Sequence, residues 1–210
     1  QGVAGTGKTL IAKEAARRFG EEGRKVLFLC FNKFLFSYLM RTFPYKNVIY
    51  YNIHTFIANF RHGEDTSADD KRVAVLQKID WDEFDFDDII IDEAQDFLNE
   101  EVIYFKDYME LKEGHFFAFY DKNQILTTKE VPEWIRNSEC KLLLTKNCRN
   151  TYEIALTSYN VIDITLDKKV MMVNGDQTSI SFIKGSHISG MTKLLNLLTG
   201  DQQGYEYSDI

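Results

Sequence analysis

The chain has 210 residues, of which 44% are hydrophobic and 14% aromatic, and its formal net charge is −7. This composition is typical of one packed domain or slightly more, and it excludes a disordered chain. The negative charge argues against coating nucleic acid by bulk electrostatics, although it leaves room for a local binding surface. No apolar run approaches the ~20 residues of a membrane span, so we expect no membrane contact. Three widely spaced cysteines favour a reducing compartment, and we expect a cytoplasmic protein.

The first pattern along the chain is GVAGTGKT, residues 2–9, a complete phosphate-binding loop of the form Gly-x-x-x-x-Gly-Lys-Thr. Its glycines let backbone N–H groups turn towards phosphate oxygens, and the helix predicted to follow adds its positive end. Lys8 would reach the β- and γ-phosphates of ATP, and the Thr9 hydroxyl would hold Mg²⁺. The strand that feeds such a loop would lie before Gln1. The ATP contacts expected from the loop are Gly2, Ala4, Gly5, Thr6, Gly7, Lys8 and Thr9.

Apolar runs of strand length alternate with amphipathic patterns in the rest of the chain, which predicts an α/β fold with a parallel sheet covered by helices on both faces. Strands are expected within residues 24–31, 46–52, 88–97, 115–124 and 141–151, and further strands within 168–173, 178–185 and 205–210. Helices are expected within residues 8–23, 32–43, 53–60, 68–79, 99–112, 151–162 and 190–200.

The run IIIDEAQD, residues 89–96, is a buried strand pattern that ends in carboxylates. Asp92 and Glu93 are expected at the carboxyl edge of the sheet, where α/β proteins bind ligands. Asp92 would hold Mg²⁺ through a water molecule, and Glu93 would orient and deprotonate the water that attacks the γ-phosphate. The two neighbouring carboxylates favour hydrolysis over simple nucleotide storage.

Together, GVAGTGKT and DEAQD resemble the motifs of UvrD/Rep-like superfamily 1 helicases, and the resemblance continues in order through FYDKNQ, residues 119–124, and TKNCRNT, residues 145–151. The motif sequences are most similar to those of helicases that are often joined to a nuclease-related (NERD) domain. The resemblance therefore implies a nuclease domain or subunit as a partner outside these 210 residues. The resemblance implies a first RecA-like domain over residues 1–148 and part of a second over residues 149–210.

What the resemblance implies is an ATP-driven translocase on single-stranded nucleic acid, DNA in the first place and RNA as the alternative. Gln124 and Arg149 match residues that contact the γ-phosphate, so both join the expected ATP-binding and catalytic set with Lys8 and Glu93. The segments LCFNK and IHTF resemble those that touch single-stranded DNA, although two of their phenylalanines are also candidates for the core. The expected nucleic-acid contacts are Phe31, Asn32, Lys33, His54, Thr55 and Phe56.

A second hypothesis remains open: ATP binding orders the site and recruits a partner without movement along nucleic acid. A GTPase is a poorer interpretation, because FNKF lacks the aspartate that reads guanine, and a small-molecule kinase is poorer still. The sequence does not determine the oligomeric state. Because the family's fifth and sixth motifs are not within residues 1–210, we expect these residues alone to hydrolyse ATP poorly and to unwind nothing.

Overall fold

The computed structural model describes residues 1–60, 65–80, 84–125, 131–161 and 187–199. The chain divides into two compact units, Gln1–Asn174 and Gly175–Ile210. In the second unit the described part is the helix α8, His187–Leu198. The strands expected within 168–173, 178–185 and 205–210 lie outside the described residues, and the expected boundary between residues 148 and 149 stays a prediction.

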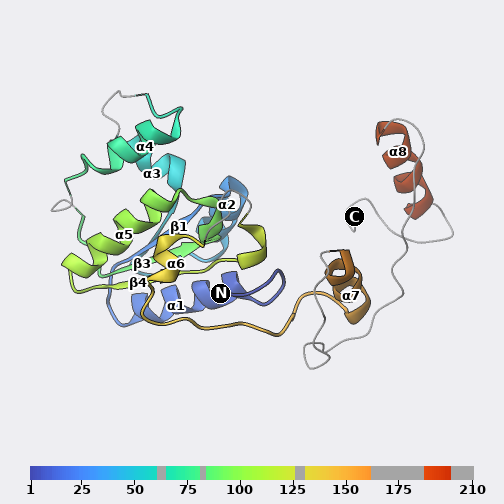
Figure 1. Cartoon of the computed structure of the whole chain (residues 1–210), viewed down its shortest axis with the longest axis horizontal. Coiled ribbons are helices and arrows are strands. Elements are labelled where there is room, and N and C mark those ends of the chain that lie inside the picture. Colours follow the sequence, from blue (N-terminus) through green and yellow to red (C-terminus); the bar gives the residue numbers. More distant parts are fainter. Residues whose placement is uncertain (61–64, 81–83, 126–130, 162–186, 200–210) are drawn as a thin grey trace. The chain divides into compact units, whose positions relative to one another are not determined.

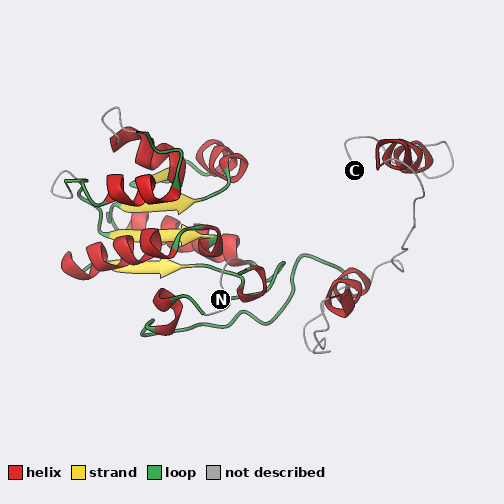
Figure 2. Cartoon of the chain, turned by 45° about the horizontal axis from the view of Figure 1, so that its top comes forward, coloured by secondary structure: helices red, strands yellow, loops and turns green. Residues whose placement is uncertain are grey.

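A four-stranded, all-parallel sheet forms the centre of the first unit (Figure 2). Its order is β2 (Val48–Asn52), β1 (Val26–Cys30), β3 (Asp88–Asp92) and β4 (His115–Ala118). Cys30 is in register with Asn52 on one side and Asp92 on the other, so the carboxyl ends of three strands lie level. The sheet confirms the predicted α/β fold of the RecA-like P-loop type.

Successive residues of the central strands point to opposite faces of the sheet, as the strand period requires. Leu27, Leu29 and Ile91 pack against one layer, α3 (Ile53–Phe60), α4 (Asp69–Leu76), α5 (Asn99–Leu111) and α6 (Glu133–Arg136). Val26, Phe28 and Ile90 pack against the other layer, α1 (Lys8–Glu21) and α2 (Lys33–Thr42). Figure 1 shows these helices around the sheet, and α7 (Tyr152–Val161) follows later in the same unit.

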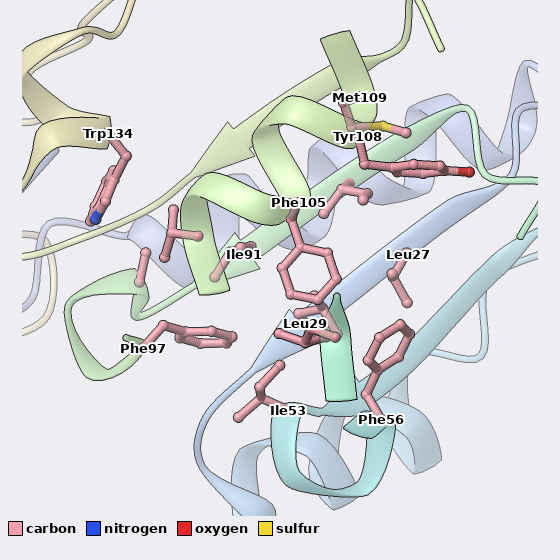
Figure 3. Packing of buried hydrophobic residues seen from close by; sticks show 14 of the residues in the cluster. Leu27, Leu29, Ile53, Phe56, Ile91, Phe97, Phe105, Tyr108, Met109 and Trp134 are labelled. Atoms are coloured by element: carbon pink, nitrogen blue, oxygen red, sulfur yellow. The ribbon is translucent and has the colours of Figure 1, made fainter. Parts of the chain in front are cut away.

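The larger core cluster is rich in aromatic rings, and Figure 3 shows how they interdigitate between β1, β3 and the helices. Phe56 is fully buried and lies 5.6 Å from Phe105, ring centroid to centroid. Burying a side chain of this size stabilises the fold by about 2 kcal/mol. Trp134 packs edge-on against Tyr120 at 5.1 Å, which anchors the short helix α6.

One detail differs from the prediction. The apolar run at residues 141–145 forms a single parallel bridge, Leu144 with Gly2, and no named strand. Helix α1 ends at Glu21, within the range predicted for it, and Gly20 lies inside the helix: a Cβ at Gly20 would be 2.2 Å from the Lys46 carbonyl oxygen, so glycine is needed there for close packing. Among the described residues, no helix has the length and hydropathy that crossing a membrane requires.

Candidate nucleotide-binding site

The phosphate-binding loop is attached to the edge of the sheet by its first residues. Gly2 N–H donates to the Tyr120 carbonyl at 3.1 Å, and Leu144 N–H donates to the Gln1 carbonyl at 2.8 Å. Gly5 and Gly7 have φ values of 80° and 86°, in the left-handed region that glycine adopts without strain. The loop therefore turns sharply between the sheet and α1.

The amino-terminal end of α1 is prepared for an anion. Its cap residue, Gly7, offers no side-chain hydrogen bond, and the first turn holds no acidic residue. The first N–H groups of a helix have no partner within the helix and carry partial positive charge. The first helical residue, Lys8, is buried and adds a full positive charge there; its Nζ is bonded to the Gly2 carbonyl at 3.0 Å and the Val3 carbonyl at 3.4 Å. These groups would bind the phosphates of a nucleotide.

Asp92 stands at the carboxyl end of β3 with no exposed surface. Burial raises the pKa of its carboxyl to about 6, against the lowering effects of the Thr9 hydroxyl and the Lys8 charge. Its Oδ1 accepts from Glu93 N–H at 3.1 Å, while its Oδ2 is buried and makes no well-formed hydrogen bond to any described residue. A buried carboxylate oxygen without a partner, beside a threonine hydroxyl, fits Mg²⁺, which takes one or two protein oxygens together with water and phosphate.

The neighbouring residue Glu93 has φ 55° and ψ 48°, a left-handed conformation that a residue with a Cβ adopts at a cost of about 1–2 kcal/mol. The turn is held by Ala94 N–H, which donates to the Phe119 carbonyl at 2.8 Å. This conformation directs the chain away from the strand immediately after Asp92. The Asp92 carboxylate is buried next to Thr9 and Lys8, whereas the Glu93 carboxylate joins the partly exposed network described next.

A hydrogen-bonded network joins Glu93 to the end of β4. Gln95 Nε2 donates to Glu93 Oε2 at 2.8 Å and to Gln124 Oε1 at 3.3 Å. Gln95 Oε1 accepts from Asp121 N–H at 3.0 Å. Gln124 itself is exposed, in the short turn η3, Lys122–Gln124. The structure thus links two predicted site residues, Glu93 and Gln124, through the side chain of Gln95, which was not predicted.

The loop that carries Arg149 is bonded directly to the phosphate-binding loop. Cys148 N–H donates to the Gly5 carbonyl at 2.8 Å, and Asn147 Nδ2 donates to the Ala4 carbonyl at 3.4 Å. Asn147 Oδ1 accepts from the N–H groups of Arg149 and Asn150 at 3.1 and 3.0 Å. Arg149 is exposed beside this turn, so its guanidinium is free to approach a ligand of the loop.

The residues predicted to contact nucleic acid differ in how far they are exposed. Phe56 is buried in the core, so we correct its assignment: its ring has no exposed face on which a base could stack. Phe31 is half-buried and packs edge-on against His54 at 4.9 Å, and Asn32 caps α2 by accepting from Phe34 N–H at 2.8 Å. Burial, with the charges of Arg72 and Lys33, lowers the pKa of His54. Lys33 and Thr55 are exposed.

Sequence reasoning missed three polar residues that tie the loops together: Gln95, Asn147 and Asn52. Asn52 is fully buried at the end of β2; its Oδ1 accepts from His54 N–H at 3.1 Å, and its Nδ2 donates to the Phe31 carbonyl. The available signal was an amide side chain directly after or within each motif. A pattern of residue types does not show which backbone groups such an amide will reach.

The loop glycines allow a matched test. Gly7 and Gly23 have nearly equal φ values, 86° and 89°, and a Cβ at either position would meet no atom within 4 Å. We expect Gly7→Ala and Gly23→Ala each to lower the free energy of unfolding by about 1–2 kcal/mol. ATP affinity, measured by fluorescence titration, should fall only for Gly7→Ala. Equal ATP affinity of the two variants would contradict the site.

Gln95 should position Glu93. In Gln95→Leu the Glu93 carboxylate loses the side-chain donor that the described residues give it, and we expect the turnover number for ATP to fall about 10- to 100-fold, as small misplacements of reacting groups do. The KM for ATP should change much less. Gln77→Leu, an exposed glutamine at the end of α4, is the control. A Gln95→Leu enzyme with normal turnover would show that Glu93 needs no such support.

This arrangement of loop, helix and acidic strand end defines a P-loop protein of RecA-like fold. The comparison with protein families narrows the class: a family model described as Schlafen group 3, DNA/RNA helicase domain, matches residues 1–198. The chain therefore belongs to the Schlafen group 3 DNA/RNA helicase domain family. No curated protein matches the chain. The match supports the predicted helicase-like family, whereas the finer resemblance to UvrD/Rep-like helicases stays a prediction.

Proposed function

We propose that this chain is the ATP-binding motor part of a helicase, which hydrolyses Mg²⁺-ATP when it binds single-stranded nucleic acid. DNA is the first expected substrate and RNA the alternative. The observation that carries the proposal is Asp92: its unpartnered, buried Oδ2 lies beside Thr9 and Lys8, at the end of a strand that flanks the phosphate-binding loop. Membership of a DNA/RNA helicase domain family supports the same function.

Each residue has a role that follows from its place. Lys8 and the first turn of α1 would hold the β- and γ-phosphates, and Thr9 and Asp92 would hold Mg²⁺, whose charge offsets that of the phosphates. Glu93 would accept the proton of the attacking water. Gln124 and Arg149 would contact the γ-phosphate, Gln124 because an amide both donates and accepts, and Arg149 because its planar fork matches phosphate oxygens.

The test is ATP turnover by the full-length protein with and without oligonucleotides. We expect single-stranded DNA or RNA to stimulate the release of phosphate, and duplexes of the same sequence to stimulate it less. Titration with both types of single strand would establish the preference. Turnover that no nucleic acid changes would contradict the motor.

A switch without translocation is the second candidate, and one observation favours it. The chain carries a net charge of −7, which disfavours movement along a polyanion. A switch would turn over slowly whether or not single strands are present, and its partner would bind only with the γ-phosphate in place. Rapid turnover stimulated by single strands would exclude it.

Other expectations remain proposals of the same kind. These are a relation to UvrD/Rep-like helicases, two RecA-like domains divided near residue 148, a cytoplasmic location, and a nuclease domain or subunit as a partner. Limited proteolysis with mass spectrometry would test the division, because cleavage between compact domains is faster than within them.

A further inference from the structure

Charge is segregated along the chain. Residues 23–60, which form β1, α2, β2 and α3, contain five Lys or Arg residues and no Asp or Glu. Because the whole chain has a net charge of −7, the rest carries −12. Arg24 and Lys25 are paired with Asp88 and Asp85, whereas no described residue forms an ion pair with the remaining three, Lys33, Arg41 and Lys46. Lys33 and Arg41 are in α2 and Lys46 follows it, so this segment of an acidic protein carries cations that no described carboxylate pairs with.

Helix α2, whose place beside the sheet Figure 1 shows, also carries exposed aromatic rings. Phe34 is 88% exposed and Tyr38 is 52% exposed, while Leu39 is buried against the sheet. Phe34, Tyr38 and Arg41 are spaced i, i+4 and i+7, so they lie along one face of the helix. A phenylalanine that is almost fully exposed contributes little to the core, and a pair of rings beside an unpaired arginine fits a ligand that has both flat apolar faces and negative charge.

The aromatic row continues past the end of α2. Tyr38 packs edge-on against Phe43 with ring centroids 5.7 Å apart, and Lys13 Nζ lies 3.6 Å from the centroid of Phe43. Lys13 comes from α1, the other helix of this layer. Two carboxylates of α1 are already bonded: Arg17 contacts Glu14 and Glu21. The helices of this layer therefore present little free negative charge to a polyanion.

We propose that the α2 strip, which comprises Phe34, Tyr38 and Phe43 with Lys33 and Arg41, binds single-stranded nucleic acid. Bases stack on the exposed rings, and phosphates contact the two cations, the combination by which single strands are held without sequence preference. A duplex keeps its bases stacked on each other and does not offer their faces. The strip rests on the proposed function and extends it, because it lies on the outer face of α2 and not in the loops after the strands.

The burial of the other candidate rings supports this surface. Phe56 is in the core and Phe31 is half-buried, so the rings expected to stack on bases are those least able to do so. The strip supplies exposed rings from the same part of the sequence. Lys33 is the first residue of α2, so the strip begins at the carboxyl edge of the sheet, the edge at which Asp92 lies.

The first experiment measures the affinity of the full chain for fluorescent oligo(dT) and oligo(U) by anisotropy, without nucleotide. Phe34→Ala and Tyr38→Ala should each weaken binding about 10-fold, since stacking on one ring is worth that much or more. Phe34→Trp and Tyr38→Phe keep an aromatic face and should restore it. Leu111→Ala, an 85% exposed leucine on the opposite layer, should leave the affinity unchanged.

The second experiment varies the salt concentration. Lys33→Ala and Arg41→Ala should each lower the slope of log affinity against log salt by about 0.7, the value for one phosphate contact on a single strand. Lys141→Ala, an exposed lysine outside the strip, should not change the slope. Equal slopes in all three variants would overturn the assignment of phosphates to α2.

The outcomes separate the strip from the proposed function. In one outcome, single strands stimulate ATP turnover and yet bind Phe34→Ala and Tyr38→Ala as tightly as the unchanged chain. That result would refute the α2 strip as the binding surface and leave the proposed motor function intact. If the two variants instead reduce self-association in sedimentation, with unchanged oligonucleotide affinity, the strip is a protein contact and the proposal fails. If no single strand binds at all, both the strip and the motor are refuted.

Discussion

Replacing Glu93 by glutamine should lower the turnover number for ATP about 10²- to 10⁴-fold, the contribution of a positioned general base. The amide keeps the shape of the side chain and tolerates the same left-handed backbone, but it cannot accept a proton at neutral pH. The affinity for ATP should change little, because Glu93 is not among the groups assigned to the phosphates. Single-turnover phosphate release and nucleotide titration measure the two quantities separately.

A matched control is Glu139→Gln, which removes one carboxylate from an exposed position in the segment before residue 141. It should leave turnover and affinity as they are, and so show that the loss is not a general effect of charge. If Glu93→Gln retains full turnover while Lys8→Ala loses ATP binding, the phosphate site is right and the general base lies elsewhere.

Asp92→Asn should raise the stability of the nucleotide-free protein while it abolishes Mg²⁺-dependent ATP binding. Burial raises the pKa of Asp92 from 3.8 to about 6, so the folded chain holds this proton more tightly than the unfolded chain. The stabilisation by the proton is complete below about pH 4 and is lost as the pH rises through about 6. Above that pH the ionised carboxylate costs up to about 3 kcal/mol, since one pKa unit is about 1.4 kcal/mol.

The gain from asparagine therefore depends on pH in a testable way. Without nucleotide, we expect Asp92→Asn to raise the free energy of unfolding by about 1–3 kcal/mol at pH 7.5. This gain in stability should be smaller at pH 5, where the native carboxyl is already mostly protonated. Thermal unfolding at the two pH values measures this. An unchanged advantage at pH 5 would mean that desolvation of a charge is not its source.

Asp88 provides the opposite case on the same strand. It is also fully buried, but Arg24 donates to both of its carboxylate oxygens at 2.7 Å, and His115 contacts it at 2.8 Å. Asp88→Asn leaves Arg24 without its ionic partner and should lower the stability by about 2 kcal/mol. Replacement by asparagine should thus change the stability in opposite directions at the two ends of β3, because Asp88 is paired with Arg24 whereas the Oδ2 atom of Asp92 has no hydrogen-bond partner among the described residues.

The sequence predicted those parts of the fold that depend on local patterns, and it failed for those that depend on contacts between residues distant along the chain. The apolar runs of β1 and β3, the helix pattern after Lys8 and the glycine loop were recognisable because strand, helix and loop each impose a local period or a local backbone requirement. The failures were non-local. The residues around Leu144 form only one bridge, and the helix α6 with Trp134 is held by contact with Tyr120.

For the candidate site, the sequence by itself determined the chemistry: a glycine loop with Lys8 and Thr9, and a strand that ends in Asp92 and Glu93. These residue types are close to their neighbours along the chain, so a motif contains them whole. Only the tertiary structure decided which groups are free to act. Within the described part of the chain Oδ2 of Asp92 has no hydrogen-bond partner, Gln95 is bonded to Glu93, and Phe56 is buried whereas Phe34 is exposed. Burial and hydrogen bonding depend on segments that are distant in sequence and packed together only in the fold.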